Sequence, residues 1–165
     1  MSSERCHPRV AYRVAAIVAC LFGWAAGVGF AQQLPLNAQL TVAAWDAFNK
    51  GEFERAIEIA DKCLDEFRLS AEREQAALEK AKVPLPPTGA VPDNVKKAIL
   101  ARGVLNDVGT CLFIKGRSAE SLGRRDVARL AYEGAKKLNY ARCWDPKGWF
   151  WSPAEAAGDR LLGMQ

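Results

Sequence analysis

Residues 51–64, GEFERAIEIADKCL, and residues 123–138, GRRDVARLAYEGAKKL, share one spacing of small residues. In each stretch an Ala follows the leading Gly after five positions, as Ala56 and as Ala128. A Gly commonly ends one helix, and small side chains on the next helix allow two helices to approach closely. The repeated spacing therefore predicts two hairpins of closely packed helices.

Apolar residues at three- and four-residue steps predict helices along the rest of the chain. The expected helices cover residues 37–50, 54–82, 93–122, 126–138 and 154–162. Gly103, Gly109 and Gly116 fall inside the third of these helices, where we expect them to mark close helix contacts rather than helix ends. No run of β-branched residues alternates with polar ones, so the sequence predicts an all-α fold without strands.

The segment VPLPPTGAVP (83–92) separates the second and third expected helices. Its four prolines are incompatible with a helix and favour an extended connector.

A helix, a Gly-containing turn and a helix with Ala at fixed places resemble the tetratricopeptide repeat, and also the related Sel1-type repeat. The resemblance covers residues 37–68 (repeat 1) and 109–140 (repeat 2). It implies a short stack of two antiparallel helix pairs that binds a protein or peptide partner. The family's proline after each pair is replaced by Arg68 and Tyr140, and the pairs lie 72 residues apart rather than about 34.

We explain the long separation by extended helices in residues 69–108, which would form an antiparallel hairpin protruding around the Pro-rich loop 83–92. A degenerate middle repeat in residues 69–100 is the alternative. Residues 141–165 would form a cap, because the apolar end of a helical stack must be covered. The segment CWDPKGWFWSP (143–153) supplies aromatic area for that cap, or alternatively a surface that stacks on a ligand.

The resemblance also implies which residues line a partner-binding groove. In the family the first helix of each pair faces the groove, and the matching positions lie two to ten residues before each turn Gly. These positions hold Trp45, Phe48 and Asn49 in the first pair and Phe113, Arg117, Glu120 and Ser121 in the second.

Residues 1–31 have the parts of a secretory signal peptide. Three arginines precede an uncharged apolar run over residues 14–31, which closes with Gly29-Phe30-Ala31. Two alternatives are an uncleaved membrane anchor formed by residues 14–31 and a lipoprotein signal with Cys20 as the lipidated residue. Each interpretation places the body of the protein outside the cytoplasm, as a periplasmic, secreted or outward-facing anchored protein.

Removal of residues 1–31 would remove the chain's one histidine, His7. The remaining Cys63, Cys111 and Cys143 lack the spacing of a cysteine metal site, so we expect no metal and no cofactor. In an oxidising compartment a disulfide could join Cys111 to Cys143; three buried thiols are the alternative.

Catalysis by the exported chain would depend on carboxylates, and Asp145, Glu155 and Asp159 near the aromatic segment are the candidates. A capping role for one of these residues and surface roles for the other two explain them far better, so we expect no enzymatic activity. No nucleic-acid motif is present. Residues 32–94 carry a net charge of −4 and residues 95–165 one of +6, a difference that is compatible with self-association.

The sequence thus predicts an exported, non-enzymatic scaffold or adaptor for protein–protein interaction. A membrane-anchored assembly factor of an envelope complex and a carbohydrate- or peptidoglycan-associated protein are the alternatives.

Overall fold

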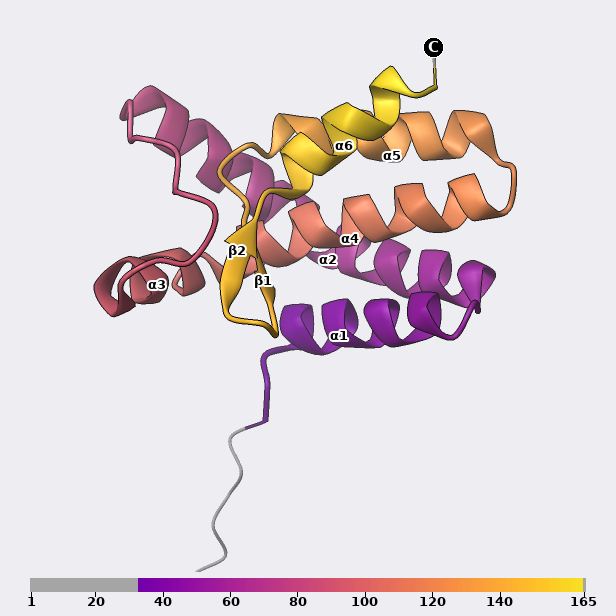
Figure 1. Cartoon of the computed structure of the whole chain (residues 1–165), viewed down its shortest axis with the longest axis horizontal. Coiled ribbons are helices and arrows are strands. Elements are labelled where there is room, and N and C mark those ends of the chain that lie inside the picture. The colour runs from indigo at the N-terminus through magenta and orange to yellow at the C-terminus, as the bar shows by residue number, and fades with distance from the viewer. Residues whose placement is uncertain (1–32, 165) are drawn as a thin grey trace, which may run out of the picture. The chain divides into compact units, whose positions relative to one another are not determined.

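The computed structural model of the protein describes residues 33–164, and the N-terminal segment interpreted above as a signal lies outside these residues. The elements are α1 (Leu36–Asn49), α2 (Phe53–Lys80), α3 (Asp93–Leu100), α4 (Gly103–Ser121), α5 (Arg125–Lys137), β1 (Cys143–Asp145), β2 (Trp149–Trp151) and α6 (Pro153–Leu162). The predicted all-α class is confirmed, with one small hairpin of strands added to it (Figure 1).

The two helical hairpins α1–α2 and α4–α5 turn in the same way. Gly51 and Gly123 have φ angles of 77° and 71°, a region that glycine enters without a steric penalty. In both turns the Gly N–H binds a carbonyl three residues back, and the next N–H binds one five residues back, at 2.9 Å for Glu52 and 2.8 Å for Arg124. This is the Schellman motif, which satisfies the carbonyls at a helix end. The predicted glycine turns are therefore helix C-caps.

Small residues bring the helices of each hairpin together. Ala56 of α2 and Ala128 of α5 are fully buried, as is Ala44 of α1. A methyl group added to the Cα of Gly116 on α4 would lie 2.4 Å from the ring of Tyr132. The close approach that the sequence predicts around Ala56 and Ala128 is thus present in both hairpins.

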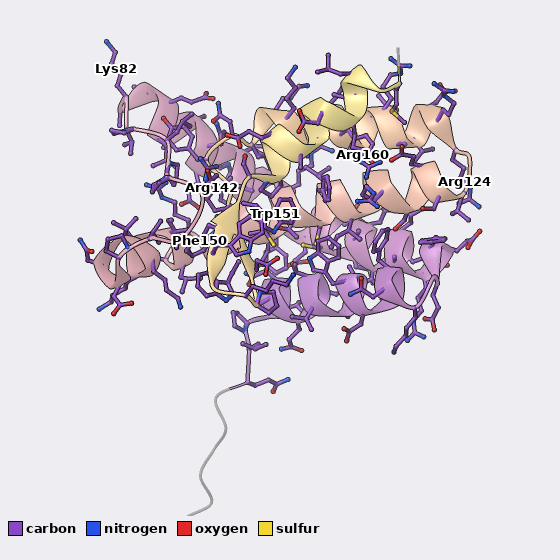
Figure 2. All side chains as sticks on the ribbon, viewed as in Figure 1. Lys82, Arg124, Arg142, Phe150, Trp151 and Arg160 are labelled. Atoms are coloured by element: carbon purple, nitrogen blue, oxygen red, sulfur yellow. The ribbon has the colours of Figure 1, made fainter. Side chains whose placement is uncertain are left out.

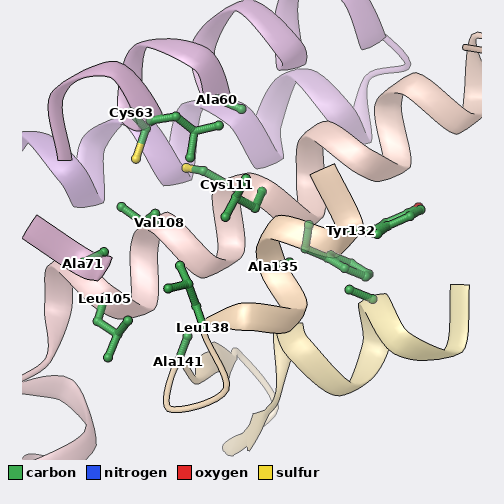
Figure 3. Packing of buried hydrophobic residues seen from close by; sticks show 14 of the residues in the cluster. Ala60, Cys63, Ala71, Leu105, Val108, Cys111, Tyr132, Ala135, Leu138 and Ala141 are labelled. Carbon is green, nitrogen blue, oxygen red and sulfur yellow. The ribbon is translucent and has the colours of Figure 1, made fainter. Parts of the chain in front are cut away.

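Helix α4 lies at the centre of the fold and packs against α1, α2, α5 and α6. Its buried residues include Leu105, Val108 and Cys111, which face small or apolar residues of α2 and α5 (Figure 3). This central position explains why α4 is buried on several sides whereas α5 is exposed along one face.

The expected continuous helix over residues 93–122 is wrong: α3 ends at Leu100, and Arg102, with a ψ of 39°, breaks the helical conformation before α4 begins at Gly103. At the break the carbonyl of Ile99 accepts hydrogen bonds from the Arg102 N–H at 3.1 Å and from the Asn106 side chain at 2.8 Å. The Asn side chain therefore replaces a helical donor, as such short polar side chains often do. Gly103 consequently marks the start of α4, while Gly109 and Gly116 mark contacts, as expected.

The break also overturns the protruding antiparallel hairpin expected for residues 69–108. Helix α3 packs against α4 rather than along α2, and it lies apart from the C-terminal end of α2 in Figure 1. The Pro-rich segment 83–92 spans the space between them and returns to the body of the fold. The hydrogen bond from the Asn106 side chain to the Ile99 carbonyl stabilises the break that gives the chain this direction. The spacing of apolar residues in the sequence does not reveal this bond.

The expected absence of strands is wrong for residues 143–151. Antiparallel strands β1 and β2 pair Asp145 with Trp149 and Cys143 with Trp151. Gly148 has a φ of 101°, and its N–H donates to the Asp145 carbonyl at 2.9 Å, which closes a three-residue turn. Aromatic residues favour strands as β-branched ones do, so the aromatic enrichment of this segment was the signal for a strand.

A buried arginine fastens the Pro-rich segment to this hairpin. Arg142 is 3% exposed, and its guanidinium donates to the carbonyls of Pro86 (3.0 Å from Nε), Asn139 (2.9 Å) and Ala141 (2.7 Å). Gly89 of the same segment exchanges two backbone hydrogen bonds with Phe150 of β2. These hydrogen bonds therefore hold the connector against the rest of the fold.

Replacing Arg142 with Gln is expected to lower the free energy of unfolding by about 2 kcal/mol, since buried carbonyl groups lose their donors. The amide of Gly89 should then exchange with solvent faster, because its bond to Phe150 depends on the same segment. Denaturation and hydrogen exchange measure the two effects. Lys147→Gln, at an exposed position in the hairpin turn, is the control and should change neither the free energy of unfolding nor the exchange rate of the Gly89 amide. Equal protection of Gly89 in the wild type and both variants would contradict the role of Arg142 in holding the segment.

Candidate functional site

An open groove of about 660 Å³ lies between α1 and the β1–β2 hairpin, with α4 and α6 contributing one residue each. Its lining consists of Val42, Trp45, Asp46, Asn49, Phe113, Cys143, Trp144, Asp145, Pro146, Trp149, Trp151 and Ala156. Four of the chain's five tryptophans are in this set. The groove is consequently mostly apolar and rich in aromatic residues, with two carboxylates at its walls.

The wall from α1 follows the helical period. Val42, Trp45, Asp46 and Asn49 stand at steps of three and four residues, so they share one face of the helix. Val42 is 52% exposed, which leaves this face open to solvent.

The floor is an aromatic cluster that joins three elements. The ring of Phe113 on α4 lies 5.1 Å from that of Trp151 on β2, and Trp45 on α1 lies 6.3 Å from Trp151. The rings meet edge to face, the arrangement that aromatic pairs prefer. Trp151 therefore holds the hairpin against both first helices of the predicted pairs (Figure 2).

The aromatic residues of the hairpin wall differ in burial, because some belong to the core and others lie at the surface. Phe150 is fully buried and packs 4.8 Å from Trp144, whereas Trp149 on the same strand is 39% exposed. Neighbouring residues of a strand point to opposite faces, which accounts for the difference. The segment thus buries Phe150 in the fold, as a cap would, and leaves Trp149 at the surface.

The structure brings three of the seven residues predicted for the groove into its lining: Trp45, Asn49 and Phe113. Two more adjoin it, since the Arg117 guanidinium lies 5.3 Å from the Phe48 ring and 5.9 Å from the Phe113 ring. Both Arg117 and Phe48 are half-buried.

The remaining two predicted residues lie elsewhere. Glu120 accepts a hydrogen bond from the Tyr132 hydroxyl at 2.7 Å and pairs with Arg160 at 3.6 Å, so its carboxylate is engaged with α5 and α6. Ser121 is the exposed last residue of α4. Val42, Asp46 and Ala156 line the groove although the sequence did not predict them; the face that Val42 and Asp46 share with Trp45 was the available signal.

All three cysteines of the described chain are free thiols, and the bridge between Cys111 and Cys143 is not formed. Cys111 instead lies beside Cys63 and Thr41, with its sulfur 3.4 Å from the Thr41 hydroxyl (Figure 3). A hydrogen bond with Cys63, together with burial, raises the pKa of Cys111 well above its ordinary value.

Cys143 lies in the groove, and its surroundings disfavour the thiolate form. Burial raises the pKa of Cys143 to about 11, and the nearby carboxylates of Asp107 and Asp145 act in the same direction. Nucleophilic cysteines need a lowered pKa. The groove therefore presents an apolar thiol rather than a reactive thiolate.

The carboxylates considered for catalysis are divided between two adjoining hollows. Asp145 lines the groove and its Oδ1 accepts the Lys147 N–H at 2.8 Å, a turn-stabilising bond. Glu155 and Asp159 line a hollow of about 330 Å³ that shares Trp149, Trp151 and Ala156 with the groove. In residues 33–164 no group of three or more His, Cys, Asp or Glu side chains is arranged to hold a metal ion.

No family model, curated protein or solved structure matches the chain. Within the described residues, no helix has both the length and the apolar character needed to cross a bilayer. The geometry of the groove is therefore the basis for the functional proposal.

Proposed function

We propose that the protein is an exported, non-enzymatic scaffold or adaptor that binds a segment of a partner protein in the aromatic groove. One observation carries the proposal: four tryptophans line an open, mostly apolar groove on the surface. Tryptophan is enriched among the residues that dominate binding energy at protein interfaces, and apolar surface that stays exposed commonly marks such interfaces.

The position of the groove also supports a binding role. One wall is α1, the floor includes Phe113 of α4, and the other wall is a hairpin pinned by Trp151. Side chains on such well-packed elements are held in place before binding, which lowers the entropy cost of association. The raised pKa of Cys143 supports binding rather than nucleophilic catalysis by this thiol.

Selection from a random 12-residue peptide library on the purified full chain would test the proposal. Enriched peptides should quench or shift the tryptophan fluorescence, because their side chains would cover Trp149. The double variant Val42→Gln/Trp149→Ala removes apolar surface at two exposed residues of the groove without changing its charge, and it should weaken binding at least 10-fold.

Leu130→Gln is the matched control, because Leu130 is 69% exposed on α5 and does not line the groove. It should bind the same peptides as the wild type. The proposal fails if no peptide is enriched, or if enriched peptides bind the groove variant and the wild type equally.

Export is tested separately by the mass of the protein recovered from its native host. A secretory signal predicts a mature chain that begins at Gln32, and an uncleaved anchor predicts the intact N-terminus. Recovery of the intact chain in the soluble cytoplasmic fraction would contradict both forms of the proposal.

A further inference from the structure

The two charged side chains that line the groove are both acidic. Asp46 stands on the α1 wall and Asp145 on the hairpin wall, and no side chain that lines the groove in the described part of the chain is basic. Asp107 lies behind the hairpin wall, where burial raises its pKa and its carboxylate accepts the Asn37 amide at 2.5 Å. Because both Asp107 and Asp145 act on Cys143, the two carboxyl groups lie near the same part of the wall.

The aromatic surface of the groove suits a cation as well. The face of an aromatic ring attracts cations, and tryptophan is the strongest of the side chains in this respect. The chain already shows this contact at the edge of the groove, where Lys96 of α3 places its Nζ 3.8 Å from the centre of the Trp144 ring. Among residues 33–164, no cation lies over Trp45, Trp149 or Trp151.

A second cationic side chain beside the groove is also placed against aromatic rings. Arg117 lies one turn beyond Phe113 on α4, over the Phe48 and Phe113 rings, and it does not line the groove. Among the described residues, the groove's tryptophan rings that carry no cation therefore belong to the lining that also holds Asp46 and Asp145.

We propose that the segment bound in the groove is cationic, with a Lys or Arg side chain that lies on the tryptophan rings between Asp46 and Asp145. This inference rests on the proposed peptide-binding function and adds the chemistry of the partner. Charge complementarity of this kind determines which partner is accepted and how fast it associates. An arginine satisfies the site best, because its planar group stacks on an aromatic ring and binds a carboxylate at the same time.

The peptides selected on the wild-type groove provide the test. Lys and Arg should be enriched and Asp and Glu depleted relative to the starting library. In the tightest binder, replacing its basic residue with citrulline or norleucine should weaken binding at least 10-fold. A rise in salt from 50 to 500 mM should weaken the original peptide more than the neutral one.

The matching protein variant is Asp46→Asn/Asp145→Asn. An Asn at position 145 keeps the oxygen that accepts the Lys147 N–H, so the turn should remain. This variant should lose at least 10-fold in affinity for the basic peptide and little for its citrulline form. Glu133→Gln, exposed on α5, is the control and should leave both affinities unchanged.

The outcomes separate this inference from the function on which it rests. Enriched peptides without an excess of basic residues, or equal affinity for charged and neutral forms, would overturn the cationic partner and leave peptide binding intact. Failure to enrich any peptide would overturn both. Binding of a chitin oligosaccharide, with no peptide competing for the groove, would overturn both in favour of a carbohydrate ligand.

Discussion

Gly116→Ala is expected to lower the free energy of unfolding by about 3 kcal/mol, the upper part of the range for overpacked cores. The added Cβ would lie 2.4 and 2.5 Å from two carbons of the Tyr132 ring. That ring is fully buried, and its hydroxyl donates to Glu120 at 2.7 Å, so it has little freedom to move away. Chemical denaturation of the variant and the wild type measures the loss.

Gly158→Ala is the matched control for this prediction. Gly158 also lies within a helix, but a Cβ there would meet no atom within 4 Å. The change should stabilise the protein by about 0.5–1 kcal/mol, because Ala favours the helix over Gly. The double variant Gly116→Ala/Tyr132→Ala should lose less stability than the sum of the losses of the two single variants, since the second change removes the clash. Equal denaturation midpoints for Gly116→Ala and the wild type would contradict the close approach of α4 and α5.

Phe150→Ala is expected to cost about 3–4 kcal/mol of stability, as is usual when a buried aromatic ring is deleted. Phe150 is fully buried, contacts Trp144 at 4.8 Å and pairs its backbone with Gly89. Its loss should therefore loosen both the hairpin and the Pro-rich segment. A large drop in the thermal midpoint is the expected result.

Trp149→Ala provides the comparison from the same strand. Because Trp149 is 39% exposed, its removal should change stability by less than about 1 kcal/mol. The same variant should weaken binding in the groove. Equal losses of stability at positions 149 and 150 would show that the whole segment serves as a cap and would remove the physical basis for the groove as a binding surface.

Local sequence signals predicted the two glycine turns and the fully buried Ala56 and Ala128, because a positive φ and a close helix contact each restrict one position to the smallest residues. They also predicted the short helix after Ser152, whose hydroxyl accepts the Glu155 N–H as an N-cap. The break before α4 was not predictable from periodicity, because Leu100 and Val104, four positions apart, continue the apolar face across it. There the Asn106 side chain competes with the helix for a backbone carbonyl.

The candidate site was predictable only in part, for a similar reason. Trp45, Asn49 and Phe113 follow from their helical positions, which the resemblance to helical repeats supplies. The other wall consists of residues from 143 to 151, about 100 positions later in the chain, and no local pattern indicates that Trp151 lies against Trp45. Glu120 has a position suited to a groove, yet its partners on α5 and α6 draw it away.

By itself the sequence determined the helical class, the two hairpins and their closest contacts, since these depend on residues a few positions apart within one helix or turn. Only the tertiary structure decided that the aromatic segment folds as a strand hairpin opposite α1 and that two aspartates and four tryptophans share one groove. Such a grouping depends on how elements far apart in the chain pack together, and that packing is fixed by the shapes of the buried side chains on all of them at once.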